Sequence, residues 1–143
     1  MDILSTSASF VVGVVAGILI AKAMEQSKTN EVVDKEKLLE ECFGEHMYVG
    51  TFSLAQARDW IKARQENINR GAKALVLKIT PEALQRLGKN IQISSDMDNY
   101  LAIAVINSTT KEMEDSILVK YDELDEQLEE LLAKGDGTLV VGG

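Results

Sequence analysis

The sequence predicts a mixed α/β or α+β domain that follows a single N-terminal transmembrane helix. Residues 3–21 form an uncharged and largely apolar run. Later in the chain, short apolar segments of strand length alternate with segments of helical periodicity. We therefore divide the chain into an anchor helix over 1–24, an amphipathic connector helix over 25–46, and a compact domain over 47–143. That domain is expected to hold one small mixed β-sheet packed with about three helices.

The uncharged run is long enough to cross a bilayer as a helix. Its 19 residues, at about 1.5 Å each, span roughly the 30 Å of a hydrocarbon core. Lys22 and Lys28 follow the run, whereas only Asp2 precedes it. Because loops rich in Lys and Arg stay inside, the expected location is the membrane, with the C-terminal domain in the cytoplasm.

Two other interpretations of this run remain open. Ala21-Lys22-Ala23 has the small-x-small form of a signal-peptidase site, so the run fits a cleaved signal peptide. The residues before it carry no positive charge, which disfavours a signal peptide. The run also fits a helix buried in a soluble core, although it is longer than most core helices.

Small residues recur along the anchor at every fourth position. They are Ser9, Gly13, Gly17 and Ala21. At this spacing they share one helix face, and small side chains there let two helix backbones approach closely in lipid. The pattern predicts that the helix pairs with a second copy, which makes the protein a homo-oligomer.

The connector and the start of the domain have clear boundaries. Apolar residues at helical spacing predict the connector helix near 31–43, ending at Gly44. A short apolar strand is expected over 47–52. Ser53 with Gln56 three residues later forms a capping-box pattern, which predicts that a helix begins there.

Glycines and a proline mark the next elements. The helix that begins after the capping box is expected to end at Gly71. Residues 74–79 read as a buried strand. Thr80 followed by Pro81 predicts another helix start, and Gly88 ends that helix.

Four strands and a helix complete the expected order. Strands are predicted over 91–94, 100–107 and 117–121, with the second apolar on both faces as a central strand would be. A helix over 122–132, capped by its first residue, and a last strand over 138–141 follow. The sequence does not determine the order of strands in the sheet.

Charge is unevenly distributed in this acidic chain. The net charge is −8, which disfavours nucleic acid as a partner because phosphate contacts require basic residues. Residues 53–90 nevertheless carry eight bases against three acids, and residues 111–136 carry ten acids against three bases. Arg58 and Lys62, one helical turn apart, form a candidate basic contact face. Two solvated helix faces of opposite sign are the simpler explanation of the pattern.

The chain contains one cysteine and one histidine. Cys42 and His46 are four residues apart, which on a helix would put a thiol beside an imidazole. The pair is compatible with metal binding or thiol chemistry, but Gly44 lies between them and a structural zinc site needs four ligands. A buried cysteine beside a surface histidine is the simpler interpretation. We select no catalytic, cofactor-binding or metal-ligating residue.

The sequence therefore favours a membrane-anchored interaction or scaffold protein over an enzyme. Its expected partners are the membrane, a second copy of the chain and a further protein of unknown identity. One alternative is a small membrane-tethered hydrolase or transferase whose carboxylates the sequence does not single out. Another is an exported ligand-binding domain released by signal-peptide cleavage.

Overall fold

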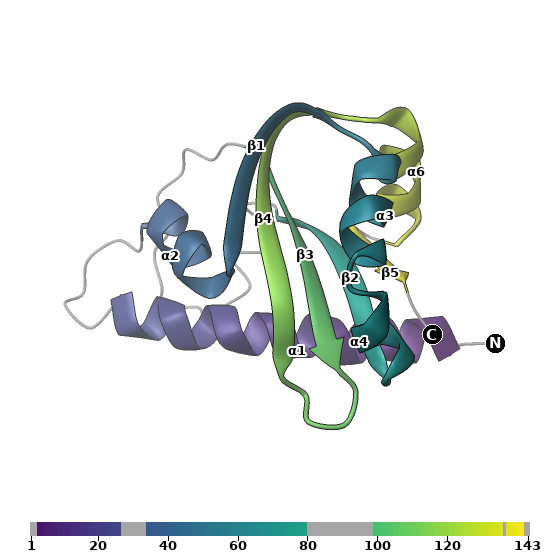
Figure 1. Ribbon diagram of the computed structural model, residues 1–143. Coiled ribbons are helices and arrows are strands. Elements are labelled where there is room, and N and C mark those ends of the chain that lie inside the picture. The colour runs from purple at the N-terminus through teal and green to yellow at the C-terminus, as the bar shows by residue number, and fades with distance from the viewer. Residues whose placement is uncertain (1–2, 27–33, 80–98, 136, 142–143) are drawn as a thin grey trace.

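A five-stranded mixed sheet forms the centre of the molecule, with strand order β1-β4-β3-β2-β5 (Figure 1). The computed structural model describes residues 3–26, 34–79, 99–135 and 137–141. β1 pairs in parallel with β4, and the other neighbouring strands pair antiparallel. β1 and β2 therefore run in the same direction, although β4 and β3 lie between them. The strands are β1 (Glu45–Phe52), β2 (Ala72–Ile79), β3 (Tyr100–Asn107), β4 (Met113–Leu124) and β5 (Thr138–Val141).

Helices cover both faces of the sheet, so the molecule has three layers (Figure 1). Two helices pack on one face, and α1 crosses the strands there with contacts to β2, β3 and β5. Three more of the described helices pack on the other face. The helices are α1 (Ile3–Gln26) and α2 (Lys35–Cys42) on the first face, and α3 (Leu54–Lys62), α4 (Gln65–Asn69) and α6 (Glu126–Lys134) on the second.

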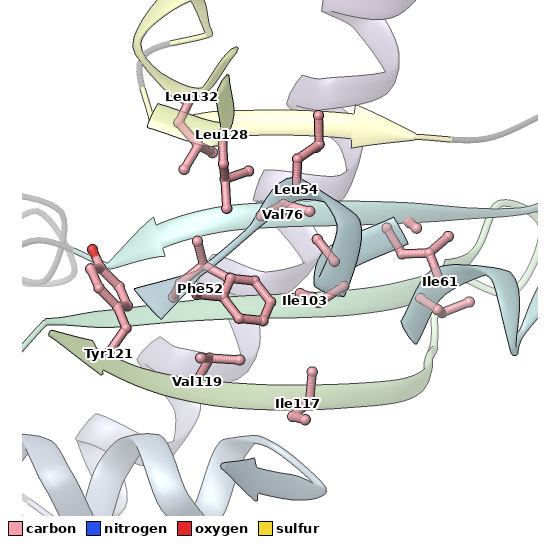
Figure 2. Packing of buried hydrophobic residues seen from close by; sticks show 14 of the residues in the cluster. Phe52, Leu54, Ile61, Val76, Ile103, Ile117, Val119, Tyr121, Leu128 and Leu132 are labelled. Carbon is pink, nitrogen blue, oxygen red and sulfur yellow. The ribbon is translucent and has the colours of Figure 1, made fainter. Parts of the chain in front are cut away.

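Strand β3 shows how one apolar segment serves two cores. Side chains of a strand alternate between the two faces of its sheet, so a strand covered on both sides is apolar throughout. The residues of β3 that pack toward α1 and α2 are Tyr100, Ala102, Ala104 and Ile106. Those that pack toward α3, α4 and α6 are Leu101, Ile103 and Val105. Figure 2 shows this second core, where Phe52, Leu54 and Ile61 meet Val76, Ile103 and Ile117.

Side-chain caps fix where several helices begin. In α3, Ser53 Oγ accepts a hydrogen bond from the Gln56 N–H at 3.2 Å, and Gln56 Oε1 accepts one from the Ser53 N–H at 2.9 Å. The predicted capping box is thereby confirmed. Asp34 accepts hydrogen bonds from two N–H groups in the first turn of α2. Caps of this kind satisfy backbone donors that the helix itself leaves unpaired.

Four of the strands that the structure describes were predicted closely, whereas the strand predicted over 117–121 is only the middle of β4, which runs from Met113 to Leu124. Strands 100–107 and 138–141 are confirmed at both ends, and 47–52 and 74–79 each begin two residues earlier than predicted. The connector helix of 31–43 is present as α2. The helix predicted to start at Thr80 and the strand predicted over 91–94 lie outside the described residues. The coarse fold class, a mixed sheet with several helices, is confirmed.

Two helix predictions are wrong. The helix expected to run from Ser53 to Gly71 is two helices, because Arg64 leaves the helical conformation between α3 and α4. Asp122 caps no helix, since β1 pairs along β4 as far as Leu124 and holds Asp122 within that strand. Asp125 caps α6 instead, with Oδ1 accepting from the Gln127 N–H at 2.7 Å.

The anchor prediction remains open. Within the parts of the chain that the structure describes, no helix is sufficiently long and apolar to cross a bilayer. The side chains of α1 are described from Gly13 to Glu25 only. Its membrane-spanning character stays a prediction.

Candidate functional site

The residues predicted to pair two helices lie on the side of α1 that faces away from the sheet. Gly13, Gly17 and Ala21 are exposed. A Cβ atom built on either glycine meets no other atom within 4 Å. Ser9 belongs to the same helix, but its side chain lies outside the described part. The structure thus brings the three described members of the stripe together on one outward face.

The opposite side of α1 is buried on the sheet. Val15, Leu19 and Ala23 recur every fourth residue and are 2%, 5% and 0% exposed. They belong to the same apolar cluster as Leu75, Ile79 and Leu118 of the strands, among others. Residues four apart on a helix lie one above the other, so this side forms a continuous stripe along the sheet.

Between Gly13 and Ala21 the helix is therefore apolar around its whole circumference. Surface helices of soluble domains carry polar residues on the side away from the core. Here the outward side holds glycine and alanine, and continues with Met24, which is 60% exposed. Charge enters only near the C-terminal end, where Lys22 and Glu25 form an ion pair at 3.4 Å.

Cys42 lies under this helix, at the end of α2. It is 6% exposed and shares the apolar cluster of α1. Burial raises the pKa of the Cys42 thiol to about 11; the nearby Lys22 acts to lower that pKa and Glu41 to raise it further. At neutral pH the thiol stays protonated, whereas nucleophilic and metal-ligating cysteines are thiolates. Cys42 therefore does not have the properties of a reactive thiol.

His46 does not turn toward Cys42. Its Nε2 lies 3.0 Å from the carbonyl oxygen of Glu40 and 3.1 Å from that of Phe43. Carbonyl oxygens only accept hydrogen bonds, so Nε2 carries the proton and caps the C-terminal end of α2. Among the residues that the structure describes, no three or more His, Cys, Asp and Glu side chains are placed to hold a metal ion.

The predicted basic residues lie on the opposite layer of the molecule. Arg58 and Lys62 are exposed on α3, whose buried residues face the second core. Helices α1 and α3 pack on opposite faces of the sheet (Figure 1). The basic pair and the outward face of α1 consequently point to opposite sides of the molecule, and one flat surface cannot contact both.

A polar cluster that the sequence did not reveal is centred on Arg64. Its Nε donates to Asp115 Oδ2 at 2.7 Å, and a terminal nitrogen donates to Glu45 Oε1 at 2.9 Å. The guanidinium also lies over the Trp60 ring, 3.6 Å from its centroid. These contacts join the end of α3 to β1 and β4. The available signal in the sequence was the aromatic–arginine pair four residues apart on a helix.

The chain matches no protein-family model, no characterised protein and no solved structure.

Proposed function

We propose that the protein is a membrane-anchored interaction protein, in which α1 is the anchor and the α/β domain binds a protein partner. The observation that carries the proposal is the apolar outward side of α1. A helix without a polar side belongs in a protein interior or in a bilayer. The domain covers only the side that holds Val15, Leu19 and Ala23. In a bilayer, lipid would surround the helix on every side.

The uncharged N-terminal run of the sequence and its flanks support this role. The helix has 24 residues, about 36 Å at 1.5 Å per residue, against a hydrocarbon core of about 30 Å. Residues 3–21 include no charged side chain. Lys22 and Lys28 on the C-terminal side favour a cytoplasmic domain by the positive-inside rule. A tilt of the helix would accommodate the extra length.

The charges on the far side of the domain support a protein partner. Arg58 and Lys62 are exposed on α3, and acidic residues such as Glu129 and Glu130 are exposed on α6. Both helices lie on the face of the sheet opposite α1 (Figure 1). Charged patches steer association between proteins and restrict the choice of partner. Because these helices point away from the anchor, they would be accessible from the cytoplasm.

Membrane fractionation of the full-length protein tests the anchor. We expect the wild-type protein to resist extraction with alkaline carbonate and its C-terminal domain to be accessible only from the cytoplasmic side. Gly17→Arg should release the protein, because arginine near the bilayer centre costs about 2.5–3.5 kcal/mol. The folded domain tolerates this change, since nothing lies within 4 Å of a Cβ at Gly17.

Gly50→Arg is the matched control. Gly50 is also exposed with no atom within 4 Å of an added Cβ, but it lies in β1. It should leave the membrane fraction unchanged. A wild-type protein that is extracted by carbonate, or that carries a processed N-terminus beyond Ala23, would contradict the anchor.

A further inference from the structure

We infer that α1 has two alternative positions, packed on the sheet or inserted in the bilayer, which we call its two seats. Entry of α1 into the bilayer uncovers the apolar sheet face and Cys42. The inference rests on the proposed function, because it requires that α1 enter a bilayer. It adds a conformational switch that the anchor alone does not imply. The device consists of described residues on both sides of the α1–sheet contact.

The contact between α1 and the sheet is apolar on both sides. The helix contributes Val15, Leu19 and Ala23, all buried. The sheet residues in the same cluster are Leu75, Ile79, Tyr100, Ala102, Ala104, Ile106 and Leu118. The ion pair described for α1, between Lys22 and Glu25, lies within the helix. A hydrocarbon environment replaces apolar contacts of this kind without leaving a buried charge unpaired.

The two seats exclude each other. A helix that spans a bilayer is surrounded by lipid or by other membrane helices on every side. Val15, Leu19 and Ala23 cannot then also contact the strands. An element with two arrangements of similar free energy responds to whichever surroundings bind one arrangement better. Here a bilayer favours α1 inserted in lipid, and without a bilayer α1 packs on the sheet.

Cys42 reports which seat is occupied. The thiol is buried in the cluster that α1 completes, and Lys22 of α1 is close enough to influence its pKa. Departure of α1 removes part of that cover and exposes the thiol. The chain has no other cysteine, so a thiol reagent labels only Cys42 in the native protein.

The experiment measures the rate at which maleimide labels Cys42 in the full-length protein. One sample is in buffer and the other is bound to phosphatidylcholine–phosphatidylglycerol vesicles and recovered by flotation. We expect labelling at least tenfold faster in the vesicle fraction. The variant Cys42→Ser with Ser108→Cys, in the exposed β3–β4 turn, should label at similar rates in both samples and controls for reagent access.

A matched pair of substitutions isolates the sheet seat. Leu19→Ala and Ile20→Ala remove nearly equal apolar volume from the anchor, so they weaken membrane partition alike. Only Leu19 belongs to the buried cluster that α1 shares with the sheet. Leu19→Ala should therefore accelerate Cys42 labelling in buffer severalfold, and Ile20→Ala should leave it near the wild-type rate.

Each outcome is decisive. Failure to float removes the anchor and this inference together. Flotation with Cys42 still protected keeps the anchor but overturns the switch, because α1 then stays on the sheet at the membrane. Rapid labelling of the wild-type protein in buffer, or equal labelling of the two alanine variants there, also overturns it, since α1 would not be seated on the sheet in solution.

Discussion

Arg64 joins three segments that are distant in the sequence. It follows α3, and its guanidinium contacts Glu45 at the start of β1 and Asp115 in β4. The Arg64 side chain is 19% exposed, whereas those of Glu45 and Asp115 are 52% and 35% exposed. Solvent partly screens such a cluster, so the cluster contributes less to stability than a buried network of the same charges. The planar guanidinium also satisfies the Trp60 carbonyl oxygen at 2.9 Å.

Replacing Arg64 should destabilise the fold moderately. We expect Arg64→Leu to lower the free energy of unfolding by about 1–2 kcal/mol, since it removes charge-assisted hydrogen bonds at a partly exposed site. The free energy of unfolding of Arg64→Lys should fall between those of the wild type and Arg64→Leu, because lysine keeps the charge but loses the fork geometry of the guanidinium. Urea denaturation measures the difference. Arg58→Leu, an exposed position on the same helix, is the control and should stay within about 0.5 kcal/mol of wild type.

Cys42 predicts a loss of stability at alkaline pH. Its folded pKa of about 11 lies above the ordinary thiol value of 9.0. Above pH 9 the unfolded chain loses the proton more readily than the folded one. The stabilisation is complete below pH 9 and is lost as the pH rises toward 11, by up to about 3 kcal/mol at 1.36 kcal/mol per pKa unit.

Cys42→Ala isolates this effect. Burial also raises the pKa of Tyr121, with a smaller contribution from Glu129, so the wild-type curve includes a second group with the same sign. The wild-type protein should lose stability more steeply than the variant between pH 9 and 11 in denaturant titrations. Parallel curves for the two proteins would show that the Cys42 thiol is accessible to water in the folded state.

At the scale of elements, α1 places the residues for helix pairing and the residues for packing on the sheet on opposite faces, so the two properties can be changed separately. Its outward face carries the predicted pairing residues, and its inward face packs on the sheet. Substitutions on the outward face can therefore test helix pairing without disturbing the fold. The open space around Gly13 and Gly17 makes such substitutions sterically free in the domain.

Gly13→Leu with Gly17→Leu should weaken self-association in a membrane reporter assay, because bulky side chains keep the two backbones apart. The same double variant should not lower the stability of the domain, since leucine exceeds glycine in helix propensity by about 0.5–1 kcal/mol. Val14→Leu, on a half-buried neighbouring position, serves as a size control. Unchanged association of the double variant would exclude pairing through this face.

On the scale of the whole molecule, the sheet requires cover on both faces. One face is covered by α3, α4 and α6, and the other by α1 and α2. Central strands such as β3 are apolar on both sides, so loss of either layer exposes a hydrophobic surface. Exposed apolar surface of this extent promotes association.

Removal of residues 1–26 should therefore leave a domain that binds the dye ANS and forms oligomers during size-exclusion chromatography. The expected cause is exposure of Leu75, Ile79 and Leu118, among others that α1 and α2 cover. Full-length protein in detergent-free buffer is the reference. A truncated domain that stays monomeric and does not bind the dye would show that α1 is dispensable as a cover.

Local signals predicted many elements but not their arrangement. The apolar run of 100–107 and the Ser53 capping box depend on neighbours in sequence, and both are confirmed. The parallel pairing of β1 with β4 depends on residues about seventy positions apart, as does the hydrogen bond from the Gly44 N–H to Ser116 Oγ. The same holds for Arg64, whose partners come from two distant strands.

The packing of α1 on the sheet was not predictable from the sequence for a different reason. A helix that docks on a domain usually reveals its inward side through helical periodicity. The apolar residues of α1 surround the helix, so no periodicity distinguishes Leu19 from Ile20. An evenly apolar helix is compatible with a bilayer and with a core, and sequence reasoning favoured the bilayer on length alone. The contacts with the sheet supply what the pattern lacked.

The position of α1 before all five strands in the sequence also has a consequence for protein synthesis. The surface that receives α1 includes Leu75 of β2, the even-numbered residues of β3, and Leu118 of β4. The ribosome makes α1 before all of these. At about 5–20 residues per second, several seconds separate the emergence of the helix from the completion of its seat. During that interval α1 has no intramolecular partner, so a targeting factor or a bilayer meets it before the sheet does.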